Sequence, residues 1–261
     1  MSVRVLALAV AGSLAAVAVP FAQETLNYIG RYEDVRRVVQ DERPTDEFVF
    51  ARLVYNGVEP YYIKNWYTDW PKADRQLIMG LRRLSNIHIA AHERVVALND
   101  PRLFEYPFLY TSEPGQMVLT DRDASIMREY LERGGFWVVD DFWGSFEWGN
   151  FRRQIEKILP GVEIRDIPRD HRLFHCFYDI DQIVQVPSLD YINTGVVVEQ
   201  DGFEPYVKGI WSESGRLMVV INHNTDLGDA YEHADHPLYP HAFSGFAYRM
   251  AINFIVYSLT S

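Results

Sequence analysis

The apolar run 136–139 constrains the fold of this chain more than any other feature. It reads FWVV, without the alternation of a half-buried strand, and it follows Gly134 and Gly135 and ends at Asp140 and Asp141. Unalternating apolar strands are typical of parallel sheets whose two faces are both covered by helices. The run therefore predicts an α/β chain in which one central strand ends in two adjacent carboxylates.

Strand-like and helix-like patterns alternate along the rest of the chain. Strands are expected at 47–55, 88–98, 106–112, 162–168 and 194–202, and helices at 68–86, 120–135, 151–161 and 242–259. Asn56-Gly57 is a turn signal. Thr68 or Asp69 is the expected N-cap of the first helix, and Thr120 with Asp123 is a capping box for the second. The SESG turn predicts a hairpin between 206–211 and 216–221. We expect a three-layer α/β sandwich with a mainly parallel sheet and an appended antiparallel hairpin.

The N-terminus has the pattern of a secretory signal peptide. Arg4 precedes an uncharged apolar run, 5–19, and small residues follow at Ala18 and Ala22. This run is shorter than the roughly 20 residues that span a bilayer, so cleavage is expected and no stable membrane anchor remains. The expected organisation is a signal peptide at 1–22, an N-terminal arm at 23–46 and one domain at 47–261, in a periplasmic or secreted protein.

The charge balance narrows the class of partner. The chain carries 25 Lys and Arg against 36 Asp and Glu, a formal net charge of −11. Nucleic acid is a poor partner for such a surface, so a polar small molecule or an envelope protein is expected instead. The single cysteine, Cys176, cannot form an intramolecular disulfide and is expected to be a small buried side chain.

Two polar clusters follow predicted strands. Ligands of open α/β sheets bind beyond the carboxyl ends of the strands, where Asp140 and Asp141 fall, and the stretch 223–241 adds many polar side chains after another strand. Alternation along the strand favours Asp141 facing the cleft with Asn224 and Asp226, while Asp140 binds backbone amides. The ligand-binding candidates are Asp69, Tyr110, Asp140, Asp141, Trp143, Asp170, His171, His223, Asn224, Asp226, Asp229 and Glu232.

The same residues support a divalent metal as one alternative. The metal-ligand candidates are Asp141, His223, Asp226, Glu232 and His236. Glu232 and His236 share a face if their segment is helical, but no established zinc motif is present, and no other cofactor is expected. The other interpretation is that the carboxylates cap the loop and the histidines are exposed. Asp170 and His171 are a candidate acid/base pair.

Seven segments together resemble the bacterial family named domain of unknown function 4159: FARLVYNG, WYTDWPKAD, YPFLYTSEPG, YLERGGFWVVDDFWG, IPRDHRLF, INHNTDLGDAYE and AINFIVYSLT. The resemblance covers 48–260 and implies a class I glutamine-amidotransferase-like, flavodoxin-like fold. Enzymes of that class place a nucleophilic cysteine at a strand-to-helix turn, whereas 140–144 reads DDFWG and contains neither Cys nor Ser.

A thiol-dependent glutaminase is therefore not expected. The sequence favours a ligand-binding or scaffold domain of the cell envelope that takes a carbohydrate or another polar small molecule in an aromatic-rimmed cleft. A metal-dependent hydrolase that uses the same Asp- and His-rich loops is the alternative. A protein-interaction domain is the third interpretation.

The signal peptide gives a first prediction. The mature chain is expected to begin after Ala18 or Ala22 and to be recovered from the periplasm or the medium without detergent, because the apolar run ends in small residues that signal peptidases accept. N-terminal sequencing of the protein isolated from cells checks this. A chain that still starts at Met1 or Ser2 would contradict it.

Overall fold

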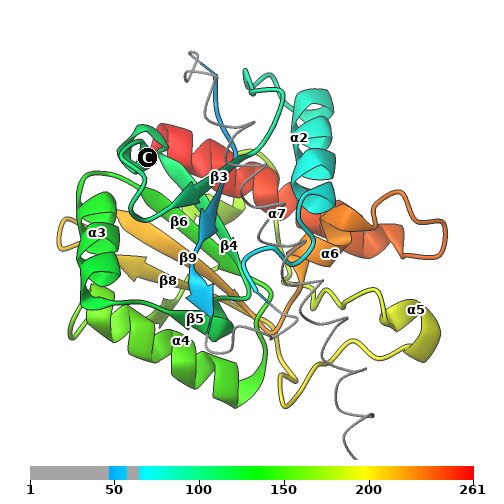
Figure 1. Ribbon diagram of the computed structural model, residues 1–261. Helices are drawn as coiled ribbons and strands as arrows, with labels where there is room; N and C mark the ends of the chain where they lie inside the picture. The colour runs from blue at the N-terminus through cyan, green and yellow to red at the C-terminus, as the bar shows by residue number, and fades with distance from the viewer. Residues whose placement is uncertain (1–46, 58–64) are drawn as a thin grey trace, which may run out of the picture. The chain divides into compact units, whose positions relative to one another are not determined.

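A seven-stranded mixed sheet forms the centre of the protein (Figure 1). The structure, a computed structural model, describes residues 47–57 and 65–261, so the expected signal peptide and arm lie outside the described residues. The strand order is β3-β1-β4-β6-β9-β8-β7. The bounds are β1 (Ala51–Val54), β3 (Arg94–Ala97), β4 (Phe108–Ser112), β6 (Phe136–Asp140), β7 (Arg165–Asp166), β8 (Tyr206–Trp211) and β9 (Leu217–His223).

The topology confirms the expected fold class. Strands β3, β1, β4, β6 and β9 are parallel, and in chain order they lie as 2-1-3-4-5, an order known from doubly wound α/β sheets. Strands β8 and β9 form the expected antiparallel hairpin, with an irregularity at Ile210 and Trp211, and β7 pairs antiparallel with β8. Because the five parallel strands point the same way, their carboxyl ends meet at one edge of the sheet.

Helices cover both faces of the sheet (Figure 1). Helices α3 (Asp121–Glu132) and α4 (Gly144–Ile158) pack together on one face, and α2 (Lys72–Leu84), α6 (Leu227–Glu232) and α7 (His241–Thr260) on the other. Alternate residues of β6 serve the two layers: Phe136 packs on Tyr257 of α7, with ring centroids 5.7 Å apart, and Trp137 packs on Phe151 of α4 at 6.2 Å. This double coverage explains the unbroken apolar run 136–139.

Short elements complete the described chain. They are β2 (Asn56–Gly57), η1 (Leu103–Glu105), η2 (Pro114–Gln116), β5 (Met117–Val118), η3 (Arg172–Phe174) and α5 (Tyr191–Thr194). Among the residues that the structure describes, none of the helices combines the length and apolar character needed to cross a membrane. Cys176 is half-buried rather than fully buried, and its Sγ lies 3.3 Å from the carbonyl oxygen of Asn253 in α7.

Several local expectations are wrong. Asn56 and Gly57 do not form a turn but pair with β5 as a two-stranded ribbon. Helix α2 begins at Lys72 with Pro71 at the N-cap position, because Asp69 takes a left-handed conformation and its carboxylate does not cap the helix. No strand forms over 194–202, where α5 and irregular backbone are found instead.

Two helix boundaries have clear local causes. At the start of α3, Thr120 accepts a hydrogen bond from the amide of Asp123 and the carboxylate of Asp123 accepts one from the amide of Thr120, so the predicted capping box is confirmed. Helix α4 starts at Gly144, well before the expected 151, and the carboxylate of Glu147 accepts a 2.6 Å bond from the amide of Trp143. Strand β6 therefore turns almost at once into α4.

A buried ion pair joins β1 to α2. The guanidinium of Arg52 binds both carboxylate oxygens of Asp74 and also donates to the carbonyl oxygens of Trp66, at 2.9 Å, and Thr68, at 3.1 Å. Both charged side chains are essentially inaccessible, with 0% and 1% of the Arg52 and Asp74 surfaces exposed. This pair fixes the segment that immediately precedes α2.

Removing one partner of this pair is expected to destabilise the fold strongly. Asp74→Asn leaves the Arg52 charge buried without a counter-charge, which costs about 3–5 kcal/mol of unfolding free energy. Urea unfolding measures the loss. The matched control is Asp166→Asn, which breaks the exposed pair of Asp166 with Lys208 and is expected to cost about 1 kcal/mol or less. Equal costs for the two variants would contradict the prediction.

Candidate functional site

Three neighbouring parallel strands end in the same unusual backbone conformation. The residue after β4 is Glu113, the residue after β6 is Asp141 and the residue after β9 is Asn224, with φ angles of 52°, 58° and 59°. Left-handed backbone is uncommon for residues other than glycine and costs roughly 1–3 kcal/mol where it is imposed. Such strain collects at functional sites, so the carboxyl edge of β4, β6 and β9 is the first place to look for one.

A fourth residue of this kind reaches the same edge from another part of the chain. Asp69, with φ of 64°, lies two residues before the N-cap position of α2. Arg52 holds the carbonyl oxygens of Trp66 and Thr68, which fixes the segment that carries Asp69. The carboxylate of Asp69 lies against Gly228 at the start of α6, where a Cβ atom would sit only 2.2 Å from its Oδ2.

Three of these four residues, Asp69, Glu113 and Asp141, line a pocket of about 600 Å³. Its lining carries seven carboxylates, at Asp69, Glu113, Asp141, Asp190, Glu199, Asp226 and Asp229. Hydroxyl groups line it at Thr68, Ser188 and Thr194, and aliphatic side chains at Leu189 and 196–198. Among the described residues, no Lys, Arg or His lines the pocket, so the electrostatic potential inside it is strongly negative.

Three of the carboxylates converge at the base of the pocket. One oxygen each of Asp69, Asp141 and Asp226 lie within 4.8 Å of one another. Asp141 is oriented by the indole N–H of Trp143, 3.3 Å from Oδ1, and by the hydroxyl of Ser112, 3.4 Å from Oδ2. We call Asp69, Asp141 and Asp226 the aspartate triad.

Burial and the repulsion of neighbouring carboxylates disfavour the charged forms of Asp69 and Asp226. The pKa of Asp69 is raised well above its usual value by burial and by the charges of Asp229 and Asp141, against a smaller opposing effect of Arg52. The pKa of Asp226 is raised by burial and by the charges of Asp141, Asp229 and Asp69. A bound cation would offset both penalties, because opposite charge favours the ionised carboxylate.

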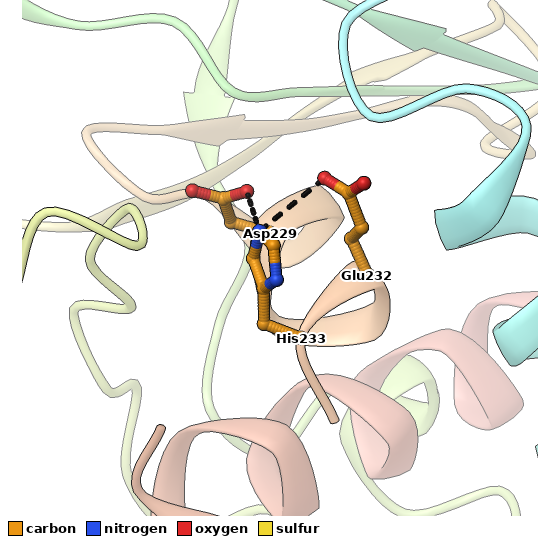
Figure 2. Close-up of side chains that lie close together, drawn as sticks. All are labelled: Asp229, Glu232 and His233. Atoms are coloured by element: carbon orange, nitrogen blue, oxygen red, sulfur yellow. Dashed lines mark ion pairs between the residues drawn. The ribbon is translucent and has the colours of Figure 1, made fainter. Parts of the chain in front are cut away.

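A second group of side chains lies on α6 (Figure 2). The Nε2 atom of His233 is 3.3 Å from Oδ1 of Asp229 and 3.4 Å from Oε2 of Glu232. The other oxygen of Asp229 accepts a 2.6 Å hydrogen bond from the amide of Leu189, which holds the opposite wall of the pocket. Burial raises the pKa of Glu232, while the neighbouring His233 lowers it.

The two adjacent aspartates have different surroundings. Asp140, the last residue of β6, is fully buried, and its Oδ2 accepts hydrogen bonds from the hydroxyl of Tyr110, at 2.8 Å, and from the amide of Gly228, at 3.1 Å. Burial and the charge of Asp141 raise its pKa well above the usual range. Asp141 instead lines the pocket, because its left-handed backbone turns the chain away from the strand direction.

The aromatic rim expected from the sequence is not found at this pocket, because no aromatic residue lines it among the described residues. Tyr110 and Trp143 are buried and support the carboxylates of Asp140 and Asp141. Asn224, expected to face the cleft, uses its side chain to bind the amide of Gly144 and the carbonyl oxygen of Glu204. These residues shape the site without lining it.

The structure does not bring the remaining candidates to the pocket. His223 is buried against the rings of Phe142 and Trp148, at 4.8 Å from each, and burial lowers its pKa to about 4. Asp170 is exposed, while His171 caps η3 and its ring lies 5.6 Å from that of Tyr257. His236 shares no face with Glu232, because α6 ends at Glu232. Neither His223 nor His236 joins a metal-ligand group in the described chain.

One wall of the pocket was missed by the sequence patterns. It is formed by 185–204. The side-chain amide of Gln185 donates hydrogen bonds to the carbonyl oxygens of Gly202 and Asn224, and the hydroxyl of Tyr239 donates one to the carbonyl oxygen of Pro187. This wall contributes Ser188, Asp190, Thr194 and Glu199. Of the pocket residues that the sequence analysis missed, only Glu113 could have been expected at this edge of the sheet, because it directly follows a predicted strand.

The raised pKa values lead to a prediction on pH. In metal-free protein, the folded state holds the protons of Asp69 and Asp226 more tightly than the unfolded state, so the stability that these groups contribute falls as pH rises from about 4 through the raised folded pKa values. Asp69→Asn, which tolerates the left-handed backbone, is therefore expected to gain stability relative to wild type as pH rises above about 4, the usual pKa of an aspartate. Urea unfolding with a chelator measures this difference. A difference that is independent of pH would contradict it.

Comparison with known proteins identifies the family. The family model described as Domain of unknown function (DUF4159) matches residues 49–259, which include every strand and helix described above except the last residue of α7. No curated protein matches the chain. The chain belongs to the DUF4159 family, and the acidic pocket at the carboxyl edge of its sheet lies within the matched region.

Proposed function

We propose that this domain binds a divalent cation at the aspartate triad and, through that cation, a hydroxyl-rich small molecule such as a carbohydrate. The observation that carries the proposal is the convergence of three carboxylate oxygens within 4.8 Å at the base of a pocket that has no basic lining residue in the described chain. The domain would act in the cell envelope, as the signal peptide pattern predicts.

The ligand atoms favour a hard cation. Carboxylate oxygens are the preferred ligands of Ca²⁺ and Mg²⁺, and Ca²⁺ bonds to oxygen are about 2.3–2.6 Å long. A cation with such bonds can bridge oxygens that lie up to 4.8 Å apart. Ca²⁺ suits the triad better than Mg²⁺, which requires shorter bonds and a nearly ideal octahedron.

The coordination number leaves room for a second ligand. Ca²⁺ takes about 6–8 oxygen ligands, so the triad leaves positions open toward the pocket. Hydroxyl groups of a small molecule could occupy them, while Ser188 and Thr194 line the pocket as hydrogen-bonding groups and the valines at 196–198 as apolar surface. A volume of about 600 Å³ suits a ligand of the size of one or two sugar units.

The hydrolase alternative would share this cation. A cation in the triad would lower the pKa of a bound water molecule, so the cation is the first requirement of both functions. Loss of cation binding would therefore remove both, whereas a scaffold role in an envelope complex would survive it. The cation experiment separates these classes.

Thermal unfolding of chelator-treated protein tests the proposal. Added Ca²⁺ at roughly 100 times its Kd is expected to stabilise the fold by about 2.7 kcal/mol, which corresponds to a rise in Tm of about 5–10 °C. Asp141→Asn is expected to abolish this rise. Without Ca²⁺ it should keep or increase the Tm of wild type, because it removes a charge that repels Asp69 and Asp226.

The matched control is Asp181→Asn, which removes one exposed carboxylate outside the pocket and should leave the response to Ca²⁺ unchanged. Magnesium and manganese chloride serve as comparison ions. A Tm that does not respond to any of these ions, or a response that Asp141→Asn retains in full, would refute the proposal. A glycan array probed with and without Ca²⁺ then tests the hydroxyl-rich ligand.

A further inference from the structure

We infer that Asp229, Glu232 and His233 form a second metal site, distinct from the aspartate triad, that takes a transition-metal ion of the Zn²⁺ type. The site goes beyond the proposed function, since its ligands are different side chains and it does not depend on Ca²⁺. Its three side chains converge on one point beside α6 (Figure 2).

The spacing of the side chains along α6 creates the convergence. Asp229, Glu232 and His233 stand at positions i, i+3 and i+4, and residues at these spacings lie on one face of a helix. Helix α6 ends at Glu232, and the amide of His233 still donates to the carbonyl oxygen of Asp229, so His233 continues the turn. The local backbone therefore brings one imidazole and two carboxylates together.

The distances fit a metal ion better than a direct ion pair. The Nε2 atom of His233 lies 3.3 and 3.4 Å from the two carboxylate oxygens, longer than the roughly 2.7–2.9 Å of a charge-assisted hydrogen bond. Ligands bound to Zn²⁺ at about 2.0–2.1 Å with tetrahedral angles lie roughly 3.3–3.4 Å apart. The observed separations are those of two edges of such a tetrahedron.

The surroundings of this site carry an excess of negative charge. Oδ2 of Asp69 is buried against Gly228, the residue before Asp229, and accepts no hydrogen bond within the described structure. Asp229 and Glu232 both act on Asp69 as repelling charges. Lys72, a nearby cation that also acts on Glu232, forms an ion pair with Asp235 at 3.1 Å. A cation beside α6 would therefore satisfy a local excess of negative charge.

The ligand set decides the class of ion. An imidazole nitrogen with two carboxylates suits Zn²⁺ and related transition metals, whereas the triad offers oxygen alone and suits Ca²⁺. The side chains of His233 and Glu232 remain 15% and 25% exposed, so an ion can reach them from solvent. The two sites are thus separable by the chemistry of the ion.

Ion counting by native mass spectrometry and calorimetric titration tests the inference on the full mature chain. Chelator-treated wild-type protein is expected to bind one Zn²⁺ that an excess of Ca²⁺ does not displace. His233→Gln removes the nitrogen ligand and should lower the affinity for Zn²⁺ roughly tenfold or more, while the affinity for Ca²⁺ changes less than twofold. Asp141→Asn should instead lower the affinity for Ca²⁺ roughly tenfold or more, while the affinity for Zn²⁺ changes less than twofold.

His236→Gln is the matched control, because His236 is a half-buried histidine close to His233, with ring centroids 6.3 Å apart, and belongs to neither site. It should bind Zn²⁺ like wild type. Glu232→Gln serves as a second variant if His233→Gln folds poorly by circular dichroism. No uptake of Zn²⁺ by wild type, or equal uptake by wild type and both site variants, would overturn the second site and leave the proposed Ca²⁺ site untouched.

Discussion

The position of Arg52 is the constraint on which the rest of the site depends. Its buried guanidinium binds Asp74 on α2 together with the carbonyl oxygens of Trp66 and Thr68, and its charge opposes the rise in the pKa of Asp69. It also lies 4.9 Å from the ring centre of Tyr110, whose hydroxyl donates to Asp140. Strands β1, β4 and β6 are thereby connected through polar contacts that have little access to water.

This network explains how the domain tolerates so much negative charge at one edge. Asp140 has a hydroxyl donor and a backbone amide, and Asp226 binds the amide of Asp229 at the start of α6, so part of each carboxylate is satisfied inside the protein. One oxygen of Asp140 and one of Asp69 still accept no hydrogen bond in the described structure. The remaining repulsion is the free energy that a bound cation would release.

Most of the fold could be predicted from the sequence, because its signals are local. The run 136–139, the capping box at Thr120 and the hairpin of β8 and β9 each depend on neighbouring residues, and the structure confirms them. Helix α2 was expected correctly except at its start, where the sequence favoured a side-chain cap and the structure has a left-handed Asp69. Tertiary contacts of Arg52 fix that backbone, and no local pattern reports them.

The candidate site was only partly predictable for the same reason. Asp141 and the loop that contains Asp226 each follow a predicted parallel strand, so both were expected at the same edge of the sheet. The structure brings the carboxylates of Asp141 and Asp226 together there. The distance in sequence between Asp69 and Asp226 hides their proximity, which depends on strand order. The wall 185–204 was not predictable, because its strand-like run 194–202 forms no strand and side-chain hydrogen bonds from Gln185 and Tyr239 hold the segment instead.

The pair Asp140 and Asp141 shows how one backbone angle separates two identical side chains. Continued strand geometry would send them to opposite faces of the sheet, into the two helical layers, where both would be buried away from solvent. The left-handed φ of Asp141 instead ends the strand and directs its carboxylate into the pocket, while Asp140 stays between Tyr110 and Gly228. The carboxylate of Asp140 then holds α6 on the sheet by accepting a hydrogen bond from the amide of Gly228. The carboxylate of Asp141, supported by Ser112 and Trp143, lines the pocket, where the proposed cation would bind it.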